Sequence, residues 1–405
     1  MSRRPKKDGA LAQKLMCCWK KKCTDWSDGL TPREWGTFFP SPRGMNFAAW
    51  HGHLPLLKWL NKNCAAGCTT AAMDGAAERG HLSVVEWLHT NRSEGCSSAA
   101  MDRAAQHGHL GVVKWLHSNR SEGSAQTALA KAAQNGHLCA VEWLHNANSM
   151  IHCKTATAPM GDAAGSGHLC VVEWLHTKNW GGCTAAAMDR AAEGGHLSVV
   201  EWLHNNRSEG CTKKAMDKAA EGGHSAVIKW LHANRAEGCT TQAIDLAAQR
   251  GHLSVIEWLH ANRTEGCTKA AMDNAAKSGH LPVVEWLHAY RSEGCTKAAM
   301  DKAAWLGHLP VVEWLHVHRL EGCTVMAMDW AAWFGQLHVV EWLHANRTEG
   351  CTTAAMDGAA ENGHLPVMKW LRAHRSEGSS PEAVNWALWA GHPVVASWLE
   401  DNLSR

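Results

Sequence analysis

The chain has 405 residues, of which 45% are hydrophobic and 19% are charged, the composition of an ordinary globular protein. Its 40 basic and 38 acidic residues nearly cancel, so the chain as a whole is not built to bind nucleic acid or an anionic membrane. The 28 His, 23 Trp and 16 Cys stand beside a single Tyr. This skew indicates that a few residue types have been multiplied by repetition.

Residues 1–36 form a basic N-terminal segment without repeats. Its sequence is compatible with either a capping helix or a disordered tail. The segment lacks the apolar stretch of a signal peptide, and no run in the chain is long and apolar enough to span a membrane. Sixteen cysteines without a secretion signal indicate a reducing compartment. We therefore expect the protein in the cytoplasm or the nucleus.

Residues 37–402 are predicted to be one repeat array. A tryptophan followed by Leu recurs thirteen times, at residues 59, 87, 115, 143, 174, 202, 230, 258, 286, 314, 342, 370 and 398. Every step is 28 residues except one of 31, between Trp143 and Trp174, where NANSMIHCKTATAP replaces the usual NRSEGCT. Surface loops tolerate insertions, so we expect the array to continue past this one.

One unit, residues 68–95, predicts two short helices. Met73, Ala76 and Ala77 share one helical face, Thr69 or Thr70 is a suitable N-cap, and Gly80 stands where a helix ends in a left-handed residue. The second half places Val84, Val85, Trp87 and Leu88 on one face, and other units have Pro at the position of Ser83, which sets the start of the second helix. Such helices are too short to be stable alone, so stacking must bury these faces. The predicted fold is an all-α solenoid of about thirteen helix-turn-helix units.

The second half of the unit resembles the ankyrin repeat, whose helix pair meets at an AAxxGHLxVVxxLL core. The matching residues are Ala76, Ala77, Gly80, His81, Leu82, Val84, Val85 and Leu88, and the match recurs in nearly all units. Two features depart from the family: AAMD replaces its TPLH tetrapeptide, and the period falls short of about 33 residues. The missing residues belong to the segment that forms the projecting β-hairpin in ankyrins, so we expect a reduced or absent hairpin.

Cysteine, histidine and aspartate form ladders along the array, starting at His53, Cys68, Asp74 and His89. A zinc- or redox-responsive array is the alternative function that these ladders suggest. The spacing argues against it, because equivalent residues in adjacent units lie about 8–10 Å apart, one helix-packing distance. We expect each His to bond backbone in the neighbouring unit, each Cys to be a small buried side chain, and neutral buried His to make the fold less stable at acidic pH.

Every candidate nucleophile is copied many times, so the sequence predicts no catalytic residue and no cofactor. Function is expected where the units differ, on the side of the first helix that, by the ankyrin resemblance, lines a concave surface. In the middle units this side carries Arg190 with Glu193 and Lys218 with Glu221, ordinary i, i+3 pairs. Towards the C-terminus aromatic and apolar residues replace the polar ones, and the candidate partner-binding residues are Trp305, Leu306, Trp330, Trp333 and Phe334, followed by Trp386 and Trp389.

The predicted function is a non-catalytic scaffold, a monomer whose partner is another protein rather than a membrane or nucleic acid. The competing interpretation is that the aromatic rings fill space in the core.

Overall fold

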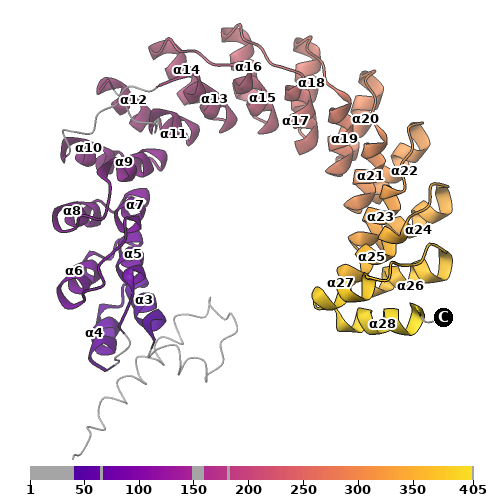
Figure 1. Cartoon of the computed structure of the whole chain (residues 1–405). Helices are drawn as coiled ribbons and strands as arrows, with labels where there is room; N and C mark the ends of the chain where they lie inside the picture. Colours follow the sequence, from indigo (N-terminus) through magenta and orange to yellow (C-terminus); the bar gives the residue numbers. More distant parts are fainter. Residues whose placement is uncertain (1–40, 64–66, 148–158, 180–182, 404–405) are drawn as a thin grey trace, which may run out of the picture. The chain divides into compact units, whose positions relative to one another are not determined.

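The computed structural model describes residues 41–63, 67–147, 159–179 and 183–403 (Figure 1). The structure is 70% helical, with 26 helices and no strand among these residues. The all-α repeat fold is therefore confirmed. The predicted N-terminal segment 1–36 lies outside the described residues, as does most of the inserted segment between Trp143 and Trp174.

The chain divides into two compact units, residues 1–152 and 153–405. The described helices of the first unit are α3 (Pro42–Trp50), α4 (Leu54–Asn63), α5 (Thr70–Glu78), α6 (Leu82–Asn91), α7 (Ala99–Gln106), α8 (Leu110–Asn119), α9 (Ala125–Gln134) and α10 (Leu138–Ala147).

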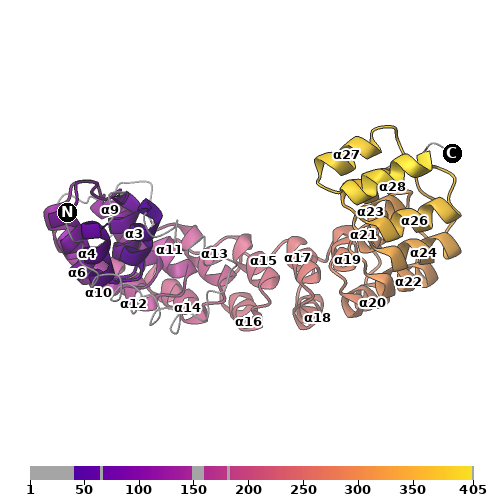
Figure 2. The same cartoon turned by 90° about the horizontal axis from the view of Figure 1, so that it is seen from below.

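The second unit contains the remaining helices in the same alternation (Figures 1 and 2). They are α11 (Pro159–Gly165), α12 (Leu169–Thr177), α13 (Ala185–Glu193), α14 (Leu197–Asn206), α15 (Lys213–Glu221), α16 (Ser225–Asn234), α17 (Gln242–Arg250), α18 (Leu253–Asn262), α19 (Lys269–Lys277), α20 (Leu281–Tyr290), α21 (Lys297–Trp305), α22 (Leu309–His318), α23 (Met326–Trp333), α24 (Leu337–Asn346), α25 (Thr353–Glu361), α26 (Leu365–His374), α27 (Ala383–Trp389) and α28 (Pro393–Leu403). Within this unit the odd-numbered helices stack side by side as an inner row, and the even-numbered helices form the outer row.

Local sequence signals set the ends of each helix, as the repeat with α21 and α22 illustrates. The Oγ1 atom of Thr296 accepts the N–H of Ala298 at 3.1 Å and caps the start of α21. Gly307 adopts a φ of 79° between the two helices, a left-handed conformation that suits glycine. Pro310 occupies the first turn of α22, where a missing N–H costs nothing.

The core consists of small and branched side chains that come from both helices of every repeat. Ala303 and Ala304 of α21 are 0% exposed, and Val312 and Leu315 of α22 are buried as well. The Ala pair leaves room for close helix approach, so neighbouring inner-row helices pack directly on one another. The outer-row tryptophan is only half-buried, as Trp314 shows, so the expectation that stacking buries it fully is corrected.

The Asp ladder joins consecutive repeats through a Ser or Thr at or just before the start of the next inner-row helix. The Oδ1 atom of Asp273 accepts the N–H of Thr296 at 2.8 Å, and its Oδ2 atom accepts the Thr296 hydroxyl at 2.6 Å. Equivalent pairs join Asp74 to Ser97, Asp189 to Thr212, Asp217 to Thr240, Asp245 to Thr268, Asp301 to Thr324 and Asp329 to Thr352. The AMD motif is therefore a connector between repeats.

The His after each repeat glycine also connects repeats, as predicted. The Nε2 atom of His137 lies 2.9 Å from the carbonyl oxygen of Gln106, and that of His224 lies 3.1 Å from the carbonyl oxygen of Glu193, each one repeat back. The ring lies against the glycine of that preceding repeat: a Cβ added to Gly279 would lie 2.7 Å from Nδ1 of His308. Because glycine has no side chain, it leaves space for the histidine ring of the next repeat.

The second His ladder lies between the outer-row helices. His288 meets the ring of Trp314 edge-on at 5.2 Å, and its Nδ1 atom accepts a hydrogen bond from Nη1 of Arg319 at 3.3 Å. Arg319 is ion-paired with Glu321 in the connecting loop. The second His ladder therefore also links consecutive repeats, through a ring contact and a side-chain hydrogen bond.

Acidification is expected to destabilise the fold. Burial lowers the pKa of His81, His109, His308 and His364 below the ordinary value of about 6.5. The unfolded chain therefore takes up protons first as the pH falls, so the stability that is present above about pH 6.5 is lost below it. The melting temperature, followed by circular dichroism, should fall by roughly a few degrees between pH 7.5 and 5.5.

A glutamine variant provides the control for this pH dependence. Gln336 occupies the same ladder position in one repeat, so His308→Gln together with His364→Gln should fold and show a smaller fall. A melting temperature that is constant over this range, or an equal fall in the variant, would contradict the assignment. The window stays above pH 5.5 because burial raises the pKa of Asp217, Asp245 and Asp301, whose protonation acts in the opposite direction.

Candidate functional site

The positions that vary between repeats lie on the solvent-facing side of the inner-row helices. On this side Trp305 of α21 and Trp330 of α23 stand at positions where α13 to α19 carry mainly polar residues. The ring of Trp305 in α21 contacts Trp330 at 5.6 Å between centroids, with an angle of 55°, and Phe334, just after α23, at 5.4 Å and 50°. We call Trp305, Trp330 and Phe334 the aromatic cluster. It spans two consecutive repeats and is held together by tilted ring contacts.

The outer surface of the cluster is open. Phe334 is 47% exposed, and Leu306, which follows Trp305, is 39% exposed. Trp305 and Trp330 are half-buried. Met326 at the start of α23 is also exposed. It was not among the predicted residues, although a Met in place of Ala298 and Ala354 of the neighbouring repeats was a usable signal.

Trp333 is placed differently from the cluster. A Cβ added to Gly358 of α25 would lie 2.4 Å from the ring of Trp333, so this tryptophan packs against the next repeat where glycine leaves space. Trp50 and Gly75 form the same pair in the first unit, with 2.8 Å between the added Cβ and the Trp50 ring. Trp333, one of the candidate residues, thus packs on the next repeat, and no ring contact joins it to the aromatic cluster among the described residues.

The other two candidate residues, Trp386 and Trp389, lie on α27. They are 41% and 87% exposed, and Leu388 and Val394 beside them are exposed too. Their repeat departs from the connecting pattern, since Asn385 stands at the Asp position and Glu400 at the second His position. The structure does not bring these rings together with the aromatic cluster in any contact between described side chains.

Charges along the same face are paired in some repeats and unpaired in others. Lys218 and Glu221 form the expected i, i+3 pair at 2.7 Å, and Glu221 also holds Arg250 at 3.2 Å. The expected pair of Arg190 with Glu193 is wrong, because Arg190 bonds Asp162 of the preceding repeat instead. A carboxylate one repeat back was closer to the guanidinium than the one on its own helix.

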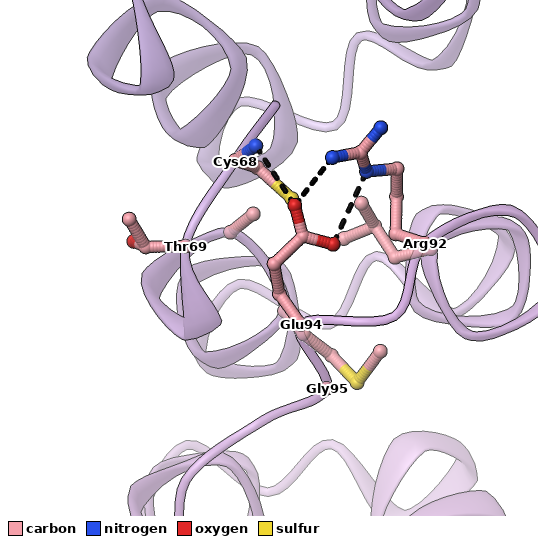
Figure 3. Close-up of a pocket in the computed structure, with 8 residues that line it drawn as sticks. Cys68, Thr69, Arg92, Glu94 and Gly95 are labelled. Carbon is pink, nitrogen blue, oxygen red and sulfur yellow. Dashed lines mark hydrogen bonds and ion pairs between the residues drawn. The ribbon is translucent and has the colours of Figure 1, made fainter. Parts of the chain in front are cut away.

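The Cys ladder lies under the loop between repeats, as Figure 3 shows for Cys68. Glu94 is ion-paired with Arg92, and its Oε1 atom accepts the N–H of Cys68 at 3.2 Å. Burial raises the pKa of Cys68 to about 11, and the pKa of Cys295 likewise to about 11. These thiols stay protonated at neutral pH, and a protonated thiol is neither a good nucleophile nor a metal ligand.

No group of three or more His, Cys, Asp or Glu side chains in the described part of the chain is arranged to hold a metal ion. The ladder side chains instead contact the backbone and other side chains of neighbouring repeats, as His137, Asp273 and His288 do. The metal- or redox-responsive alternative therefore gains no support from the geometry. None of the described helices combines the length and the apolarity needed to cross a bilayer.

Comparison with known families agrees with the repeat structure. A family model described as ankyrin repeats (3 copies) matches residues 45–122 and 101–184. A second, described as ankyrin repeats (many copies), matches residues 188–232, 216–260, 272–316 and 295–344. No curated protein matches the chain.

Proposed function

Because the chain belongs to the ankyrin-repeat family, we propose that it is a non-catalytic scaffold that binds a protein partner on its concave inner row. Ankyrin repeats generally mediate protein–protein interactions. The inner row is also where the repeats of this chain differ from one another, whereas the ladder residues serve the junctions between repeats. The proposed scaffold acts as a monomer.

The observation that carries this proposal is the open aromatic cluster. Trp305 could have been accommodated as Trp333 is, against a glycine of the next repeat. Position 330 instead holds a second tryptophan, which contacts the ring of Trp305. Phe334 and Leu306 lie beside these rings and are exposed. Exposed aromatic and aliphatic side chains that gather on one face are typical of interaction sites, and Trp is enriched among the residues that contribute most to binding.

Site-specific crosslinking tests the proposal. A photoreactive phenylalanine derivative introduced at position 334 of the full chain should form a covalent adduct with a partner in lysate of the source organism. The control places it at position 320, where Leu320 is fully exposed in the loop after α22. A specific adduct from position 334 that is absent from position 320 is expected. Equal adducts from both positions, or an adduct of the chain with itself alone, would contradict the proposal.

A further inference from the structure

Two lysines beside the aromatic cluster lack carboxylate partners. The Nζ atom of Lys277, at the end of α19, lies 5.5 Å from the ring centroid of Trp305. Lys302 precedes Trp305 by three residues on α21 and therefore lies on the same helical face. Neither forms an ion pair with a described residue, whereas Arg190, Lys218 and Arg250 further along the row are all paired.

The opposite side of the cluster carries the opposite charge. Glu361 ends α25, on the inner-row face beyond Trp333, and it forms no ion pair within the described residues. The surface thus runs from two lysines without a carboxylate partner among the described residues, across the aromatic cluster, to one carboxylate without an ion pair there. A ligand that matches this order has its negative charge on the side of α19 and α21.

Trp305 also has an unused donor. Its Nε1 atom is buried and has no hydrogen-bond partner among the described residues. A buried donor without an acceptor is unfavourable and calls for an explanation.

We propose that the aromatic cluster, with Lys277 and Lys302, binds an acidic protein segment that carries Asp or Glu within a few residues of an apolar anchor. The anchor packs on Trp305, Phe334 and Leu306, and the carboxylate lies between the two lysines. Charge complementarity of this kind sets specificity and the orientation of the ligand. This inference rests on the proposed function and names the chemistry of its partner.

Selection from a displayed library of random twelve-residue peptides on the immobilised full chain tests the inference. The recovered peptides should combine an acidic residue with a nearby Leu, Phe or Trp. The double variant Lys277→Glu, Lys302→Glu should bind a synthesised peptide of this kind about tenfold or more weakly than the wild type. Addition of 0.5 M salt should weaken the binding of the same peptide to the wild type. The same double variant should select basic peptides in a fresh round.

A matched control is available on the same two helices. Lys269 and Lys297 are exposed first residues of α19 and α21, at the opposite helix ends from Lys277 and Trp305. Changing both to Glu alters the net charge equally and should change affinity less than about threefold.

Other outcomes separate the inference from the proposed function. Uncharged apolar peptides that bind the Lys277→Glu, Lys302→Glu variant as well as the wild type, yet lose binding in Phe334→Ser, would overturn the acidic partner and leave the scaffold proposal standing. Peptides that bind independently of Phe334, or recovery of none, would count against both. Binding of a labelled twelve-nucleotide thymidine strand at the cluster, tighter than any peptide, would also overturn the inference.

Discussion

Replacing Gly279 by alanine is expected to lower the free energy of unfolding by about 2 to 5 kcal/mol. Gly279 has a φ of 77°, a left-handed conformation that costs any other residue about 1–2 kcal/mol. The added Cβ would also lie 2.7 Å from Nδ1 of His308, and overpacking of this kind adds about 1–3 kcal/mol. Urea unfolding followed by circular dichroism measures the change.

The chain contains a matched control for this substitution. Gly391 holds the same position in the last repeat, with a φ of 86°, but a Cβ added there meets nothing within 4 Å. Gly391→Ala should therefore cost only the backbone part, about 1–2 kcal/mol. Adding His308→Ala to Gly279→Ala should recover part of the loss. Equal costs at both glycines would show that the contact with the ring does not hold the repeats together.

Replacing Trp333 by alanine is expected to cost about 2–3 kcal/mol of stability, somewhat less than for a fully buried tryptophan. The ring fills the space above Gly358, and its loss leaves a void between α23 and α25. Phe334→Ala should cost less, about 1 kcal/mol, because that side chain is 47% exposed. Thermal and urea unfolding of the two variants provide the comparison.

A double substitution tests whether Trp333 and Gly358 act as a pair. Glu78 and Arg103 occupy the equivalent positions at another junction and form an ion pair at 2.8 Å. Trp333→Glu with Gly358→Arg should therefore be more stable than Trp333→Glu alone. If Trp333→Ala instead leaves stability unchanged, or Phe334→Ala is the more destabilising change, the assignment of Trp333 to packing and of Phe334 to an open surface is wrong.

The repeat pattern predicted most of the fold, because each signal acts within a few residues. Thr at the N-cap, Gly between the helices and Pro in the first turn of the outer helix each act locally, and all three occur at the predicted places. The His contact with the preceding repeat was also predicted, since a constant spacing of repeats brings equivalent residues together.

The distinction between the open aromatic cluster and the packed Trp333 could not be predicted residue by residue. Trp305 and Trp333 hold the same position in adjacent repeats, and only the residue 25 positions later distinguishes them: Trp330 in one case and Gly358 in the other. The pair Trp50 and Gly75 carried the same signal. The Asp–Thr link between repeats was missed for a similar reason, because its partners stand 23 residues apart, on different repeats.

The affinity for the partner identified at position 334 tests the central claim most directly, that the exposed part of the aromatic cluster carries binding. Leu306→Ser with Phe334→Ser removes two apolar side chains that are 39% and 47% exposed. Val317→Ser with Leu320→Ser removes two others, which are 72% and 103% exposed on and after α22, and is the control.

Isothermal titration calorimetry should show the dissociation constant of the cluster variant raised about tenfold or more, since each residue central to an interface contributes about 2 kcal/mol. The control should bind within about twofold of the wild type. Unchanged affinity in the cluster variant, with both proteins folded, would contradict the account and place the interface elsewhere on the chain.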